Sequence, residues 1–142
     1  MFTVLRNTWA LFFGFGIICI GHGLQGSLIG VRSVLEGFSF IATGLIIAGY
    51  YTGFLTGSAL IPIFLKRVGH IRVFAALASL ASIAILLHSI FLDPYSLFVI
   101  RIFSGISLSG IYIIMESWLN DKSTNQTRGQ LLSIYMIITF VF

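Results

Sequence analysis

Polar side chains in the first long apolar segment of the sequence could bind a solute or carry a proton. His22 and Gln25 lie about one helical turn apart, near the middle of that segment. An imidazole titrates near neutral pH and can carry a proton, while an amide can orient a substrate through hydrogen bonds. A hydrogen bond between neighbouring helices is the alternative interpretation for both residues. In either case we expect the two side chains to face protein or water and not lipid.

A second polar set lies in the fourth apolar segment, around an arginine. Arg101 cannot lose its proton to escape burial, so it must pair, be hydrated or extend to the membrane surface. At 100° per residue, the residues that share an arc of about 80° are Arg101, Gly105, Ser109, Tyr112 and Glu116. This stripe predicts a helix face turned away from lipid, with Arg101 and Tyr112 facing a cavity. Extension of Arg101 to the outer surface is the alternative.

The basic residues are distributed unevenly between alternate loops. On one side lie six of the eight: Arg6, Lys66, Arg67, Arg72, Lys122 and Arg128. On the other side lies Arg32 alone. Because cytoplasmic loops carry the excess of Lys and Arg, this pattern predicts a cytoplasmic N-terminus. It also predicts a tight cytoplasmic hairpin at residues 66–72, KRVGHIR.

Three charged residues near the cytoplasmic side could form a latch. Glu116 closes the fourth apolar segment, level with Arg72 and Arg128 beside neighbouring segments. Ion pairs among them would open and close with a conformational change. A static salt bridge at the membrane surface is the alternative, and such a bridge contributes little to stability.

The composition is that of an integral membrane protein. Hydrophobic residues make up 58% of the chain and charged residues 8%, against about 25% charged in soluble domains. The net charge of +4 reflects loop residues that orient helices, so we expect a lipid bilayer and no nucleic acid as partner. Cys19 is the only cysteine, and no HExxH, GxSxG or Walker-type motif occurs. We therefore expect no metal site, no cofactor and no enzymatic activity.

Hydropathy predicts an all-α fold, with each span a helix that satisfies its own backbone. The predicted spans are residues 8–31, 38–65, 73–92, 95–119 and a fifth that opens at 131 and stops in mid-span at 142. We expect one N-terminal transmembrane bundle over residues 1–142 and a chain that is a fragment of a longer protein.

Other features of the spans concern packing. Gly49, Gly53 and Gly57 form a row that predicts close contact with a neighbouring helix. Pro62 is expected to bend or end its helix before the hairpin. His88, near the outer boundary, is interpreted as a residue that extends its ring toward the surface.

Two motifs resemble the N-terminal half of a Major Facilitator Superfamily transporter. The superfamily loop signature G-x-x-x-D-R-x-G-R-R is similar to PIFLKRVGHIR here, which retains Arg67, Gly69 and Arg72. The sequence differs at Pro62 and Lys66, where glycine and aspartate are usual. The Arg-x-x-x-Gly motif matches Arg101 and Gly105, with Ser104 where glutamine is common. GHIR, ESWLN and RGQLLSIY further resemble the YcaD-like branch of bacterial inner-membrane members.

The resemblance covers essentially the whole chain but about five of the twelve helices usual in the superfamily. It implies a secondary active transporter of a small solute that works by alternating access, with spans 1 and 4 lining a central cavity completed by a C-terminal half. It also implies a role for Arg101 in proton coupling, as in several antiporters, and a gating role for the hairpin. The implied location is the inner (plasma) membrane.

The residues alone are also compatible with two other functions. One is a non-transporting membrane scaffold or partner subunit. The other is a small dimeric multidrug exporter, although such exporters usually carry an acidic residue in the first span and none occurs here.

Overall fold

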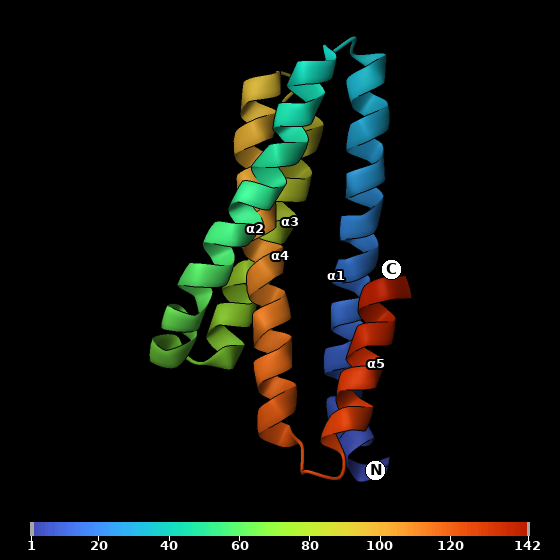
Figure 1. The fold of residues 1–142 in the computed structure, drawn as a ribbon, viewed down its shortest axis with the longest axis vertical. Coiled ribbons are helices and arrows are strands. Elements are labelled where there is room, and N and C mark those ends of the chain that lie inside the picture. The colour runs from blue at the N-terminus through green and yellow to red at the C-terminus, as the bar shows by residue number, and fades with distance from the viewer. Residues whose placement is uncertain (1, 142) are drawn as a thin grey trace. The chain divides into compact units, whose positions relative to one another are not determined.

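The computed structural model describes residues 2–141 as five α-helices (Figure 1). They are α1 (Phe2–Leu35), α2 (Phe40–Val68), α3 (His70–Ile90), α4 (Pro94–Lys122) and α5 (Arg128–Val141). The first four are long and apolar enough to cross a membrane, and α5 is a shorter apolar helix. The predicted all-helical membrane fold is confirmed. Helices α1 and α4 extend beyond the predicted segments at both ends, whereas α2 begins at Phe40, after the predicted residue 38, and α3 ends at Ile90, before the predicted residue 92. The backbone stays helical through polar residues such as Lys66 and Lys122.

A single glycine joins α2 to α3. Gly69 has a φ of 90°, a left-handed conformation that side chains other than glycine rarely adopt. Its amide donates to the carbonyl of Leu65 over 3.1 Å, which ends α2, and α3 begins at the next residue. The KRVGHIR hairpin therefore turns at one residue, and the backbone there requires glycine.

Polar side chains cap the N-terminal ends of α2 and α4. The hydroxyl of Ser39 accepts from the amide of Ala42 at 3.2 Å and starts α2. The carboxylate of Asp93 accepts from the amide of Ser96 at 3.0 Å, with Pro94 as the first residue of α4. Both are N-cap arrangements that satisfy an amide without a partner inside the helix. The hydrogen bonds from Ser96 lower the pKa of Asp93 because they favour its charged form.

The chain divides into two compact units, Gly30–Met115 and a second composed of Met1–Ile29 and Glu116–Phe142. In Gly30–Met115, α2 and α4 pack at small residues. A Cβ at Gly53 would overlap the carbonyl oxygen of Ile102, and one at Gly105 would overlap the carbonyl oxygen of Tyr50. Gly49 and Gly57 are buried in the same contact, against Phe98 and against Ile106 and Ser109. The backbones of α2 and α4 therefore touch, which small residues allow.

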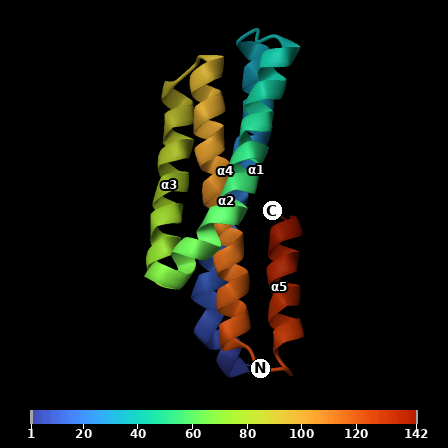
Figure 2. The same ribbon diagram turned by 60° about the vertical axis from the view of Figure 1, so that its left-hand side comes forward.

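Helix α3 packs on the same unit from another direction (Figure 2). Gly110 of α4 lies against the side chains of Leu77 in α3 and Ile61 in α2, so the three helices meet there. Within α4, 61% of the most apolar stretch is buried, against 22–28% in the other three long helices. Helix α4 is thus the most buried of these four helices, while the other three expose many apolar side chains.

Pro62 does not end its helix. Helix α2 continues through Pro62 for six residues to Val68. The expectation that this proline could end the helix is therefore wrong. The helix tolerates a proline because neighbouring turns and helices can satisfy the carbonyl that it leaves free.

In the second unit, α5 packs along α1. The rings of Phe15 and Tyr135 stack with centroids 5.3 Å apart and an interplanar angle of 29°. Both side chains are buried, and Gly16 of α1 lies beside Ile138 of α5. Aromatic stacking and a close helix approach thus hold this pair together.

Candidate substrate-binding site

Arg101 lies deep in α4, and only 5% of it is exposed. It follows the first residue of the helix, Pro94, by seven positions, which places it about 10 Å along the axis. Its guanidinium carbon stands 5.0 Å from the centroid of the Tyr50 ring, in cation–π contact. The side chain is therefore held inside the protein and does not extend to the outer surface.

Two of the three guanidinium nitrogens of Arg101 lack acceptors among the described residues. Its Nε and Nη1 are buried, and within residues 2–141 neither has a hydrogen-bond partner. A buried guanidinium in this state is unusual, because buried charges are normally paired.

Aromatic side chains extend from Arg101 along α2 and α4. The ring centroid of Tyr50 lies 6.0 Å from that of Phe54, and Phe54 lies 6.2 Å from Tyr112. These three rings are partly buried. Arg101 and Tyr112, both predicted from the sequence, therefore belong to one cluster, which we call the Arg101 cluster: Arg101, Tyr50, Phe54 and Tyr112. Periodicity on α4 alone could not have identified Tyr50 and Phe54, because they come from α2.

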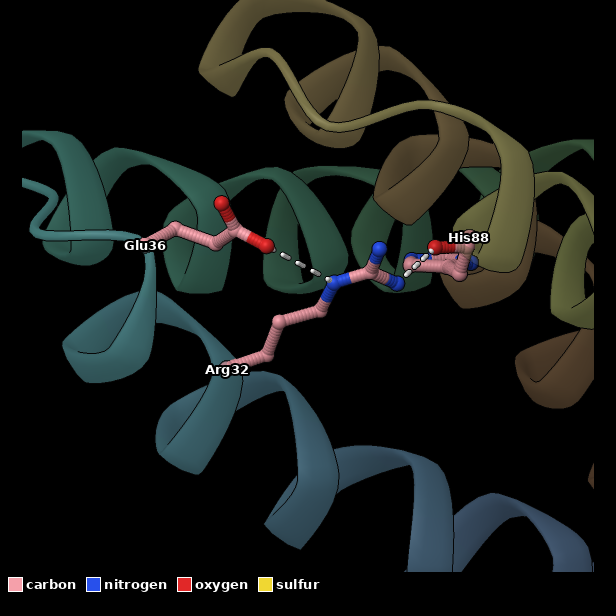
Figure 3. A network of polar contacts seen from close by, with 3 residues as sticks. All are labelled: Arg32, Glu36 and His88. Carbon is pink, nitrogen blue, oxygen red and sulfur yellow. Dashed lines mark hydrogen bonds and ion pairs between the residues drawn. The ribbon is translucent and has the colours of Figure 1, made fainter.

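A second polar network lies near the C-terminal ends of α1 and α3 (Figure 3). The Nη1 of Arg32 donates to the backbone carbonyl of His88 at 2.5 Å, and the Nε of Arg32 lies 3.9 Å from a carboxylate oxygen of Glu36. Arg32 thus satisfies a carbonyl in the last turn of α3, where cations are favourable.

The expectation that His88 extends to the surface is wrong. Only 7% of His88 is exposed, and its Nδ1 lies 2.6 Å from the carbonyl oxygen of Ala84. The α3 sequence is apolar on all sides, so its periodicity did not indicate which face turns inward.

The predicted polar pair of α1 belongs to the other unit. Gln25 is buried, with 7% exposed, and His22 is partly buried. Both side chains are therefore shielded to the degree expected of residues that face protein. Their part in a solute or proton path remains a prediction.

The predicted latch residues lie at exposed positions. Arg67 and Arg72 flank the Gly69 turn, and Glu116 is exposed on α4. Arg128, the first residue of α5, donates from Nε to the hydroxyl of Ser123 over 3.4 Å. The latch itself stays a prediction.

Comparisons with known proteins identify the family. The model for "Sugar (and other) transporter" matches residues 32–141. The "Uncharacterized MFS-type transporter YcaD" of Escherichia coli O45:K1 (strain S88 / ExPEC) is 25% identical over 141 residues, which are 99% of this chain and 37% of that protein. YcaD of Escherichia coli O157:H7 (strain EC4115 / EHEC) is 24% identical over 141 residues, which are again 99% of this chain and 37% of that protein.

This chain therefore spans about 37% of the length of the YcaD relatives that it matches. No solved structure matches it significantly. The resemblance to the YcaD-like branch is confirmed by these relatives, and the family model covers most of the chain. The chain belongs to the Sugar (and other) transporter family of the Major Facilitator Superfamily.

Proposed function

We propose that this chain forms the N-terminal part of a secondary active transporter that moves a small solute by alternating access. The observation that carries this proposal is Arg101, a permanent cation that is buried in an apolar helix and whose Nε and Nη1 have no acceptor among the described residues. Charges at this depth are costly and usually mark a path for substrates or ions. Membership of a transporter family supports the same proposal.

The proposed path combines polar residues of α1 and α4. His22 and Gln25 contribute from α1, and Arg101 and Tyr112 from α4, while a C-terminal half completes the cavity. His22 titrates near neutral pH in its ordinary state, so it is the residue best suited to carry a coupling proton. The burial of Gln25 and Arg101 supports this assignment, because side chains that face lipid would be exposed.

The proposed cytoplasmic gate contains the hairpin and the latch. Gly69 makes the turn, Arg67 and Arg72 flank it, and Glu116 and Arg128 are the proposed partners. In this arrangement the protein lies in the inner (plasma) membrane with a cytoplasmic N-terminus. The excess of basic residues on one side supports that orientation.

The test uses the full reading frame, expressed in cells that lack it, with Arg101→Ala as the inactive variant and Lys122→Ala as the matched exposed control. Small molecules inside the cells and in the medium are measured by untargeted mass spectrometry. We expect at least one solute to change its distribution with the wild type and the control. With Arg101→Ala the rate should fall about tenfold or more, because charged contacts are worth about 1.5–3 kcal/mol.

A scaffold or partner subunit would give a different result. No solute would change its distribution, and the purified protein would carry a second chain in stoichiometric amount. Unchanged transport by the Arg101→Ala variant would show that Arg101 is not part of the transport path.

A further inference from the structure

The orientation of Arg101 leaves one part of its guanidinium free. Tyr50 lies against the group with its ring centroid 5.0 Å from the guanidinium carbon. The N–H donors point outward in the plane of the guanidinium, and the face of a ring offers them no lone pair to accept their hydrogen bonds. Nε and Nη1, which point to different sides of the group, are therefore left without an acceptor within the described chain.

The acidic residues of the chain do not supply that acceptor. The four are Glu36, Asp93, Glu116 and Asp121. Among residues 9–141, whose side chains the structure describes, Glu36 lies near Arg32, and no ion pair joins a carboxylate to Arg101. A buried guanidinium without a compensating charge favours an anion as its partner.

The chemistry of the site narrows the class of anion. A guanidinium edge matches the two oxygens of a carboxylate, which accept two parallel hydrogen bonds. Arg101 offers one unpaired permanent charge, and a dianion would leave excess negative charge buried. Phe54 and Tyr112 extend the ring cluster away from Arg101 and provide an apolar surface for the rest of a ligand.

We propose that Arg101 binds the carboxylate of a small organic monoanion, and that Tyr50, Phe54 and Tyr112 contact its apolar body. This assignment rests on the proposed function, because it names the substrate class of the same path. A carboxylate from the remainder of the protein is the competing partner for Arg101. The experiment below separates the two.

The first measurement is the thermal stability of the full-length protein in detergent, without added ligand. Arg101→Gln and Arg101→Met remove a buried charge without acceptors, so their melting temperatures should equal or exceed that of the wild type. The exposed control Lys122→Gln should leave it unchanged. A marked fall with both Arg101 variants would mean that an internal carboxylate pairs with Arg101, and would overturn the proposal.

The second measurement adds monocarboxylates from acetate to phenylacetate, including benzoate, each beside its carboxamide at equal ionic strength. At least one carboxylate should raise the melting temperature of the wild type and of Lys122→Gln, while its carboxamide should not. Arg101→Gln should abolish the shift. Arg101→Lys keeps the charge but not the planar edge, and should weaken apparent binding about ten- to hundredfold.

Three results would overturn the assignment: no carboxylate raises the melting temperature, each carboxamide acts as well as its acid, or inorganic phosphate alone raises it. Flux of the stabilising carboxylate into proteoliposomes then separates this inference from the proposed function. Binding of the carboxylate without flux would contradict the proposed transport function but support the carboxylate site. Flux of neutral solutes alone, if it depends on Arg101, would support the transport function but contradict the carboxylate site.

Discussion

Arg32 and Arg101 are both guanidinium groups in apolar helices, yet their surroundings differ. Arg32 has a side chain that is 34% exposed, donates to the carbonyl of His88 and lies near Glu36. Arg101 is 5% exposed and contacts the Tyr50 ring without a hydrogen bond for Nε or Nη1 within residues 2–141. The contacts of Arg32 stabilise the fold, whereas the charge of Arg101 stays available to a ligand. Substitutions should therefore affect the two residues in opposite ways.

Arg32→Gln should destabilise the protein, because it removes the charged donor to the His88 carbonyl near the end of α3. Charged hydrogen bonds contribute about 1.5–3 kcal/mol, and partial exposure of Arg32 places the expected loss near the lower limit of that range. Chemical denaturation in mixed micelles, followed by circular dichroism, measures the free energy of unfolding.

Glu36→Gln is the matched control for Arg32. The ion pair is long, at 3.9 Å, and partly exposed, so its loss should cost about 0.5 kcal/mol or less. Equal losses from the two substitutions would show that the ion pair, and not the carbonyl contact, holds Arg32.

Asp93 should make the stability of α4 depend on pH. Hydrogen bonds from Ser96 lower the pKa of Asp93 below its ordinary value in the unfolded chain. Its cap is therefore fully effective above the ordinary aspartate pKa and is lost as the pH falls through the lower value of the folded state. Melting temperatures between pH 7 and pH 2 should fall more for the wild type than for Asp93→Asn, which can cap without ionising. Identical pH curves for the two proteins would contradict this assignment.

The sequence indicated Arg101 and Tyr112 because their spacing places them on one helix face. It did not indicate Tyr50 as the neighbour of Arg101, since that contact depends on how α2 crosses α4. His88 was misinterpreted for a related reason. A histidine near the end of an apolar helix can turn outward or inward, and the packing of other helices decides which.

Among the elements, α2 and α4 touch backbone to backbone within the unit Gly30–Met115. The row Gly49, Gly53 and Gly57 faces α4, while Gly105 of α4 faces Tyr50 and Phe54. The glycine row is visible in the sequence, and a contact surface was the natural interpretation. Which helix would meet it could not be predicted, because small residues show how closely a neighbour can approach but not which one it is.

Gly53→Ala should force α2 and α4 apart. The new Cβ would overlap the backbone carbonyl of Ile102, which cannot move as a flexible side chain could. Overpacking of this kind costs about 1–3 kcal/mol or more, which unfolding in micelles would measure.

Gly44→Ala, on the same helix, has no atom within 4 Å of the new Cβ and provides the control. It should be neutral or stabilising by up to about 1 kcal/mol, because alanine favours helix over glycine. Equal destabilisation by both substitutions would assign the effect to the helix itself and not to its contact with α4.

For the whole molecule, the apolar pattern predicted the number and order of the helices, and the motifs indicated the superfamily. Both predictions are confirmed, because a membrane span has a strong hydropathy signal. Substrate and direction of transport have no comparable signal. They depend on how a few side chains from different helices meet, and this chain spans about 37% of the YcaD relatives.

The proposed latch concerns the whole molecule, because its residues come from both units. Arg72→Glu or Glu116→Arg alone should lower transport by the full-length protein, since each reversal places like charges together. The double exchange should restore it if the two residues pair. The flux of the solute found in the transport screen is the measurement.

Lys66→Glu is the control for this exchange, because Lys66 is exposed in the same hairpin. Combining it with Glu116→Arg should give no restoration. Restoration by Lys66→Glu as well would mean that only the net charge of the hairpin matters, and the specific pair would be abandoned.

The one-residue link at Gly69 also determines where the chain can be cut or extended. A protease must bind several residues of extended chain, and tags are accepted at exposed loops and not within continuous helices. The hairpin offers a single non-helical residue there, whereas residues 123–127 between α4 and α5 form an exposed polar segment. Limited proteolysis should therefore leave the hairpin intact and cleave at residues 123–127, and the latter segment is the place to insert a fluorescent or affinity tag.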